Sequence, residues 1–285
     1  LRGFQQEFEQ KISGFGSHIT VSHYNLSQDH NDTPISITHP SVEQIRNIEG
    51  VTHVQPTATK GGMIKTEDQI HGIIYKGVDT TYDTTFFYEN LTCGRLFRLN
   101  DSSVSNEVII SSTISKKLDI DTGDKIRTYF WQGSNYRARA FNVVGVYNTD
   151  LTEFDDHFIV GDLGQIQRIN NWTKHQAANW EILINNFDRI NTIADKVVYS
   201  LPYEYNTTTI IEQNMGLFSW LNLLNSNITL ILIIMAMVCS IAIISALLIM
   251  IFEKTSTIGI LKTLGANNRS ISKIFLIKST QIITK

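Results

Sequence analysis

The uncharged run from Ile228 to Phe252, 25 residues long, most constrains what this chain can fold into. The hydrocarbon core of a bilayer is roughly 30 Å thick, and a helix needs about 20 apolar residues to cross it. A buried core helix is the alternative, but core helices of globular domains seldom extend so far without a polar face. We therefore predict a transmembrane helix over residues 228–252.

The basic residues around this run predict its orientation. Neither Lys nor Arg occurs between Val197 and Phe252, whereas the tail carries one acid, Glu253, and six basic residues: Lys254, Lys262, Arg269, Lys273, Lys278 and Lys285. Basic residues near a span favour the cytoplasmic side. The tail is predicted to be cytoplasmic, and the residues before about 228 are predicted to be periplasmic or extracellular.

Composition and chain ends give broader limits. The net charge of −3 gives no basic excess that would indicate nucleic acid as a partner. Cys93 lies in the outer part and Cys239 in the run, so no disulfide framework is expected. The chain starts at Leu1 without Met, and a second apolar stretch begins within residues 267–285. We expect a fragment of a longer multi-pass protein, with one span before Leu1 and two after Lys285.

The outer part has a strand-helix-strand pattern at each of its ends. The first unit combines strands over residues 19–22 and 51–59 with a helix that begins at Pro40, and the second has strands over 180–184 and 205–210 around a helix over 187–199. Two such units predict one α/β sandwich. The fold class expected is an α+β periplasmic domain followed by an α-helical transmembrane segment.

The residues between the two units predict a strand-rich insertion. Strands are expected over 63–66, 70–78, 107–110, 125–131, 139–147 and 158–160, with short helices over 113–118 and 163–169. Residues 132–135, Gln-Gly-Ser-Asn, predict the tip of a hairpin. Residues 212–224 predict a helical stalk that leads into the membrane.

The chain has few residues that indicate chemistry. It lacks the G-x-x-x-x-G-K-S/T motif that cradles nucleotide phosphates, so it would need an ATPase partner for energy, and no cofactor is expected in this chain itself. The spacing of His18, His23, His30 and His39 matches no closed metal site. Neighbouring residues of a strand point to opposite faces, so residues 155–157, Asp-Asp-His, indicate a loop or strand start rather than a catalytic site.

Asn-x-Ser/Thr triplets raise the alternative of a glycosylated, single-span receptor ectodomain. Seven such triplets precede the span, headed by Asn25, Asn31, Asn90, Asn100, Asn171, Asn206 and Asn227. Asn268, on the predicted cytoplasmic side, heads one as well, and a secreted receptor domain of this size usually has more than one outer cysteine. Chance occurrence in a chain rich in Asn and Thr explains the triplets.

Residues 253–276, EKTSTIGILKTLGANNRSISKIFL, resemble the segment after the second membrane helix in FtsX-like permeases of ABC transporters, especially the lipoprotein-releasing LolC and LolE type. Residues 50–79, 107–130 and 141–169 resemble the periplasmic domain of that family, in the same order. The resemblance covers nearly the whole chain. It implies a bacterial inner-membrane permease, multi-pass in full length, that transmits mechanical work and has no enzymatic activity of its own.

The resemblance also implies a division into domains. A MacB-like periplasmic domain would cover residues 1–224, with a porter part at about 1–60 and 180–211, an inserted subdomain at about 61–179 and a stalk at 212–224. An FtsX-like permease domain would cover 225–285: the transmembrane helix 228–252, a cytoplasmic coupling segment 253–266 and the start of the next membrane segment, 267–285.

Two sets of site residues follow. The amphipathic segment 253–266 is suited to docking in a groove of another protein, which in this family belongs to the ATPase subunit; the residues expected to couple there are Lys254, Thr255, Ile258, Gly259, Leu261, Lys262, Leu264 and Gly265. Lipid is the alternative partner for its lysines. The hairpin at 131–139 is short and lacks proline, unlike the carrier-capturing hairpin of LolC-type members, so a hook is not expected. If it does contact a carrier, Trp131 is the expected anchor, flanked by Arg137 and Arg139.

The expected partners are an ABC ATPase subunit, a second permease subunit in a homodimer or heterodimer, the membrane, a lipoprotein substrate and a candidate periplasmic lipoprotein carrier. Release of lipoproteins from the inner membrane is the leading function. The alternatives are another FtsX-like permease, which exports amphiphiles or drugs or regulates a cell-wall hydrolase, and the single-span receptor. The two permease functions predict an associated protein with a Walker A motif, whereas the receptor does not.

Overall fold

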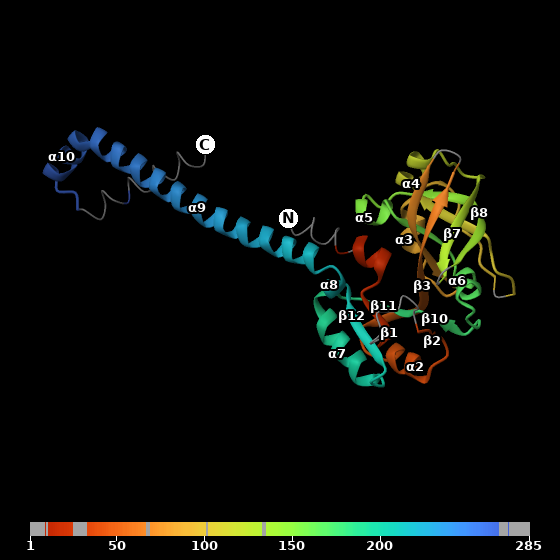
Figure 1. Ribbon diagram of the computed structural model, residues 1–285. Coiled ribbons are helices and arrows are strands. Elements are labelled where there is room, and N and C mark those ends of the chain that lie inside the picture. The colour runs from red at the N-terminus through yellow and green to blue at the C-terminus, as the bar shows by residue number, and fades with distance from the viewer. Residues whose placement is uncertain are drawn as a thin grey trace. The chain divides into compact units, whose positions relative to one another are not determined.

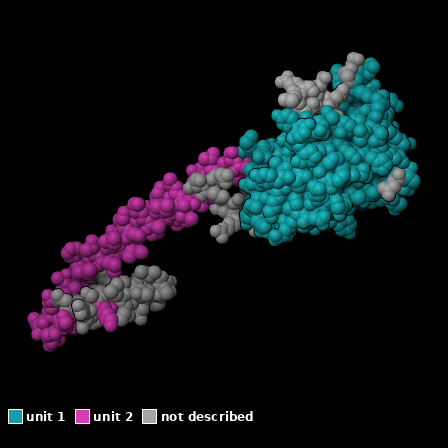
Figure 2. Space-filling model, turned by 90° about the horizontal axis from the view of Figure 1, so that it is seen from below, with its two compact units in different colours: residues 1–215 teal, residues 216–285 magenta. Residues whose placement is uncertain are grey.

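The computed structural model describes residues 9, 11–24, 33–66, 69–100, 102–132, 135–267 and 273. The chain divides into two compact units, Leu1–Met215 and Gly216–Lys285, coloured teal and magenta in Figure 2. We name the described part of the first unit the outer domain. The expected start of the next membrane segment, 267–285, lies outside the described residues except for positions 267 and 273.

The two strand-helix-strand units interleave in one sheet (Figure 1). The strand order is β12 (Tyr205–Thr209), β1 (Ile19–His23), β11 (Asn179–Ile184) and β3 (Val51–Lys65), and each neighbouring pair is antiparallel. Helix α2 (Pro40–Arg46) precedes β3, while η1 (Phe187–Arg189) and α7 (Ile190–Ser200) connect β11 to β12. Each unit thus has a strand of the other between its own two strands, the split arrangement of ferredoxin-like folds. We name this part the porter layer.

Helical spacing of apolar residues explains why α2 and α7 cover one face of this sheet. Val42 and Ile45 of α2 are buried, as are Ile190, Ile193, Ala194 and Val197 of α7, three or four residues apart. In β1, Ile19 and Val21 are fully buried, whereas Thr20 between them is half-buried. The opposite face of the porter layer is therefore the polar one.

Strand β3 corrects the prediction of two separate strands over 51–59 and 63–66. It is one strand of 15 residues and crosses the expected boundary between the porter part and the insertion. The separating glycines do not form a turn. A Cβ at Gly62 would lie 2.9 Å from both Phe130 Cδ1 and Tyr129 O, so this glycine allows the close approach of a neighbouring strand.

The insertion forms a closed six-stranded barrel. β3 pairs with β4 (Ile70–Val78), and the ring continues through β9 (Phe158–Asp162), β6 (Glu107–Ser111), β8 (Asn135–Tyr147) and β7 (Lys125–Gln132). Pairing of β7 with β3 then closes it. The shorter elements of the outer domain are β2 (Ile35–Ser36), α3 (Thr85–Glu89), β5 (Leu91–Gly94), α4 (Ser112–Leu118), α5 (Thr152–Asp155), α6 (Leu163–Asn170) and β10 (Gln176–Ala177).

Aromatic side chains fill the barrel. Tyr75, Phe130 and Phe141 are all fully buried, and the ring of Tyr75 stacks on Phe141 with centroids 5.2 Å apart. The hydroxyl of Tyr75 donates to the backbone oxygen of Asp162 at 3.0 Å, which satisfies its polar group in this apolar interior. The barrel is thus a packed core rather than a channel.

A second core lies under the helical segment 11–16. Phe15 is 1% exposed, and its ring lies 4.6 Å from Phe154 and 4.9 Å from Phe158, centroid to centroid. Phe87 of α3 and Tyr147 of β8 belong to the same cluster. Burial of one such aromatic side chain stabilises the fold by about 1.5–3 kcal/mol, so segment 11–16 is held firmly against the outer domain.

The second unit is built on α9 (Met215–Glu253), a helix of 39 residues that is about 59 Å long at 1.5 Å per residue. In the described chain, Asn227–Glu253 alone forms a helix long and apolar enough to cross a membrane, and its apolar window is 0% buried. This exposure argues against a buried core helix. Hydroxyls of Ser240 and Ser245 donate to carbonyl oxygens four residues earlier, so they need no water.

The expected stalk over 212–224 is divided at Asn214. Helix α8 (Ile210–Gln213) starts with a capping box between Thr209 and Glu212, and it ends at Asn214, which has φ −121° and ψ 42°. From Met215 onward the helix is continuous through the apolar segment.

Candidate functional site

The β7–β8 hairpin presents an aromatic pair on its outer face. Trp131 and Tyr136 are directly paired across the two strands, and their rings meet edge to face with centroids 4.7 Å apart. They are 53% and 54% exposed. The register ends at Gln132 and Asn135, which leaves a two-residue connection. Those two residues, Gly133 and Ser134 of the expected tip, lie outside the described part of the chain.

Arg137 and Arg139 lie on the opposite face of the hairpin from Trp131. They pair with Phe130 and Thr128, which point into the barrel, and residues opposite each other on paired strands share a face. The guanidinium of Arg137 donates to the backbone oxygen of Arg168 at 3.0 Å and to Asn171 Oδ1 at 3.4 Å.

Arg137 therefore contacts the end of helix α6. Arg137 bonds a carbonyl in the last turn of α6, where a cation is favoured. Burial lowers the pKa of Arg139 below its ordinary value, as do the nearby charges of Arg137 and Arg168. The structure thus does not bring Trp131, Arg137 and Arg139 together on one contact face.

The coupling residues expected from the sequence gather on α10 (Thr255–Thr263) and its two ends. The hydroxyl of Thr255 donates to the backbone oxygen of Ile251 at 3.0 Å. Gly265 has φ +85°, and the N–H of the next residue, Ala266, donates to Leu261 O at 3.0 Å, so a left-handed glycine ends the helix.

Helix α10 carries exposed apolar side chains. Leu264 is 79% exposed and Ile260 is 59% exposed, four residues apart. Apart from the helix's own backbone and neighbouring residues, no described residue comes within 4 Å of a Cβ built on Gly259, so this position leaves room for a close approach. Ile260 was not among the expected coupling residues, although its place one turn before Leu264 indicates the same stripe.

Sequence reasoning missed a buried ion pair. Lys76 of β4 is 2% exposed and Glu181 of β11 is 6% exposed, and Lys76 Nζ lies 2.9 Å from Glu181 Oε1. Each charge stands alone in an otherwise apolar strand, as in GIIYKGV and WEILI. A lone charge in such a strand indicates a buried partner, because an unpaired buried charge is strongly unfavourable.

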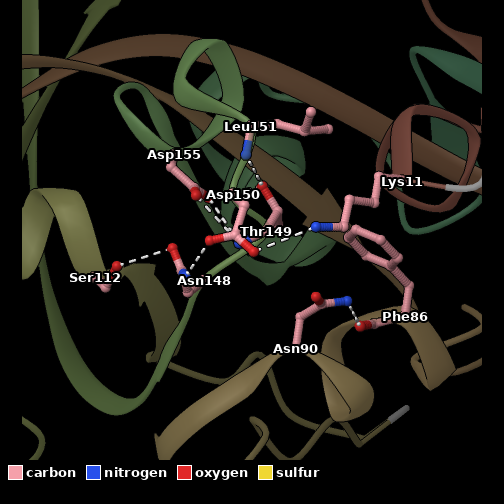
Figure 3. Close-up of polar contacts among 9 residues, drawn as sticks. All are labelled: Lys11, Phe86, Asn90, Ser112, Asn148, Thr149, Asp150, Leu151 and Asp155. Atoms are coloured by element: carbon pink, nitrogen blue, oxygen red, sulfur yellow. Dashed lines mark hydrogen bonds and ion pairs between the residues drawn. The ribbon is translucent and has the colours of Figure 1, made fainter. Parts of the chain in front are cut away.

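A polar network fixes the loop between β8 and α5 (Figure 3). The carboxylate of Asp155 accepts from Thr149 N at 3.1 Å and from Thr149 Oγ1 at 2.9 Å. Lys11 Nζ lies 3.3 Å from Asp150 Oδ2 and ties segment 11–16 to this loop. Asp155, the first acid of the triplet at residues 155–157, thus stabilises this loop through its hydrogen bonds.

The described residues contain no group of three or more His, Cys, Asp or Glu side chains that could hold a metal ion. His18 and His39 have local partners: His18 Nδ1 accepts from Ile184 N at 3.4 Å, and His39 Nδ1 accepts from Ser41 N at 3.2 Å at the start of α2. His30 lies outside the described residues.

Comparison with known proteins agrees with the order of these parts. The MacB-like periplasmic core domain matches residues 1–198, more than half of the chain, and the FtsX-like permease C-terminal domain matches residues 229–284. Both belong to transporter permeases rather than to an enzyme family.

Individual relatives are distant but cover nearly all of the chain. The lipoprotein-releasing system transmembrane protein LolC of Buchnera aphidicola subsp. Acyrthosiphon pisum (strain APS) is 22% identical over 292 residues, which cover 99% of this chain and 69% of that protein. LolC of Xylella fastidiosa (strain 9a5c) is 18% identical over 297 residues, with 99% and 67% covered. The crystal structure of the periplasmic region of MacB from Actinobacillus actinomycetemcomitans matches with a TM-score of 0.45 and 13% identity, covering 70% of this chain and 93% of that one.

The predicted resemblance is confirmed, and the chain belongs to the FtsX-like permeases of ABC transporters that carry a MacB-like periplasmic core domain.

Proposed function

We propose that this chain is the permease subunit of a transporter that releases lipoproteins from the bacterial inner membrane. The observation that supports this most is the similarity to LolC proteins over 99% of the chain, through both the outer domain and the permease segment. A protein that resembled LolC in only one of these parts would share a module, whereas likeness through both indicates a shared working cycle.

The working cycle begins at the cytoplasmic end. Residues 253–266 dock on an ABC ATPase subunit, and closure of two such subunits on ATP displaces α10. Ile260 and Leu264 supply exposed apolar anchors there, the residue type that carries helix-in-groove binding. ATP is bound by the partner, since this chain has no phosphate-binding loop.

Helix α9 then carries the displacement outward. It is continuous from Met215 to Glu253, so a tilt at one end is transmitted along the helix. In this proposal the residues before about 228 lie in the periplasm, where the outer domain moves with a second permease subunit and helps a lipoprotein leave the bilayer. No bond is made or broken in this chain.

Reconstitution tests this function. The full-length permease and its ATPase partner are placed in liposomes with a fluorescently labelled triacylated lipoprotein and a soluble acceptor protein. ATP-dependent transfer of the label to the soluble fraction is expected, and a non-acylated version of the same protein is the control. If ATP instead drives export of small amphiphiles and leaves the lipoprotein in the membrane, the chain is another FtsX-like permease.

A further inference from the structure

Three separate parts of the outer domain meet at one buried ammonium group. Lys76 is on β4 of the barrel, and its Nζ donates to the backbone oxygen of Phe15 in segment 11–16 at 2.6 Å. The same Nζ lies 2.9 Å from Oε1 and 3.1 Å from Oε2 of Glu181, which is on β11 of the porter layer. An ammonium has three N–H donors, and these oxygens provide three acceptors.

The network continues from Glu181 to a fourth element. Gln55 of β3 is 2% exposed, and its Nε2 donates to Glu181 Oε2 at 3.2 Å. Its Oε1 accepts from the backbone N–H of Asp83, just before α3, at 2.9 Å. Segment 11–16, the barrel, the porter layer and the approach to α3 are thus joined by one buried polar chain.

The ammonium of Lys76 is held in its charged form by its neighbours. Burial by itself would lower the pKa of Lys76, but the neighbouring Glu181 and then Tyr82 raise it above its ordinary value. The ammonium also lies over the rings of Phe15 and Tyr82, 5.4 and 5.3 Å from their centroids, positions in which a cation is favoured.

Such a pair is a poor source of stability. Apolar side chains of similar volume often stabilise a core as well or better, because two ions must lose their water. A buried ion pair does favour one arrangement over others, because any displacement leaves a charge without its partner. Here the partners lie on the two halves of the outer domain that share strand β3.

We propose that Lys76 is a positioning residue that holds segment 11–16, the barrel and the porter layer as one rigid body. The outer domain then moves as this rigid body when the transporter cycles, and no hinge motion occurs between the porter layer and the barrel. The packing of Phe15 against Phe154 and the ion pair of Lys11 with Asp150 also hold segment 11–16 against the rest of the outer domain. The inference rests on the proposed function only for the nucleotide-driven motion.

Distances between spin labels test it in the full-length permease with its ATPase in nanodiscs. Labels are placed at Asp195→Cys on α7 and Lys125→Cys on β7, both exposed, after Cys93→Ser and Cys239→Ala. The distance distribution is measured without nucleotide and after trapping with ATP and vanadate. We expect the same mean distance in both states. A mean that shifts beyond the width of the distribution overturns the proposal without any change at Lys76.

The double variant Lys76→Met, Glu181→Leu removes both charges and leaves an apolar core. It is expected to keep its melting temperature but to give a broader distance distribution or a second population. The matched control is Lys117→Met, Asp156→Leu, which removes an ion pair of 3.1 Å on the surface of the insertion; its distribution is expected to stay unchanged. A double variant with the wild-type distribution overturns the proposal. ATPase copurification in the same samples shows separately whether coupling to the partner fails.

Discussion

Burial gives several single residues of the outer domain a structural role that their chemistry does not suggest. Asp155 looks like one half of an acid-base pair with His157, yet burial raises the pKa of its carboxyl group while its oxygens accept hydrogen bonds from Thr149. Lys76 lies in a strand of apolar neighbours, and its ammonium donates hydrogen bonds to Glu181 and to the backbone oxygen of Phe15. These residues set positions in the fold, so substitutions there report on structure.

His18 gives the outer domain a pH-dependent stability. Burial lowers its pKa from 6.5 to about 4. The unfolded chain therefore binds a proton below pH 6.5 that the folded protein takes up only near pH 4. This contribution to stability is full above pH 6.5 and falls as the pH drops toward 4, by at most about 3.5 kcal/mol at roughly 1.4 kcal/mol per pKa unit.

Urea unfolding of residues 1–214 between pH 7.5 and 4.5 measures this loss. The control is His18→Gln, whose side chain cannot titrate. Its free energy of unfolding should vary less with pH over this range, and the variation that remains should come from the carboxyl groups. If the two proteins lose stability equally as the pH falls, His18 is not the cause.

Two single elements, β3 and α9, each run through two structural parts of the molecule. β3 serves both the porter layer and the barrel, because its first half pairs with β11 and its second half with β4 and β7. Helix α9 extends from the stalk residues through the apolar segment without a break. Motion of either end of such an element is passed on by regular hydrogen bonding instead of being absorbed in a loop.

The α10 helix is predicted to be the contact with the ATPase. Leu261→Asp places a charge in the stripe that also contains Ile258 and Leu264, so the ATPase subunit should copurify less, and ATP hydrolysis should no longer drive transport. Truncation of an anchor in such a groove costs on the order of 2 kcal/mol. Copurification yield and transport by the reconstituted complex measure the two effects.

Thr263→Asp is the matched control, because it adds the same charge to the same helix about 160° around the axis from Leu261, outside that stripe. It is expected to retain the ATPase. Normal copurification and transport in Leu261→Asp would contradict the docking role and favour a helix that lies on the membrane surface.

The β7–β8 hairpin is predicted not to capture a carrier. Its connection has only two residues and no proline, so deletion of residues 133–135 would shift the strand register and is a poor test. Trp131→Ala should instead change the affinity of residues 1–214 for the matching carrier by less than about 0.5 kcal/mol, as surface substitutions do.

A titration with purified carrier decides this, with Arg127→Ala on the same outer face as the control. A loss of about 2 kcal/mol or more for Trp131→Ala would mark a hot spot. The aromatic pair with Tyr136 would then be a compact capture site.

At the scale of the whole molecule, one spanning-length apolar helix among the described residues, Asn227–Glu253, separates the outer domain from a basic tail, and the positive-inside bias predicts that these two parts lie on opposite sides of the membrane. In intact cells, a Cys at Lys125 in the barrel should react with a membrane-impermeant maleimide, and a Cys at Lys262 on α10 should react only after permeabilisation. Cys93 is exposed and must first be replaced by Ser. The reverse labelling pattern would overturn the orientation.

The sequence by itself determined the local features: the apolar helix, the two strand-helix-strand units, the helices at α4 and α6, and the strands around the hairpin. These follow from hydropathy and from side-chain periods of 3.6 and 2, which are properties of neighbouring residues. Only the tertiary structure decided that β3 is continuous, that β7 closes a barrel, that Trp131 and Arg137 face apart, and that Lys76 meets Glu181. The facing of Trp131 and Arg137 depends on the register of one hairpin, and the other three depend on a partner far along the chain: Gly62 looks like a turn residue until Phe130 lies against it, and pairing across 105 residues leaves no mark on local periodicity.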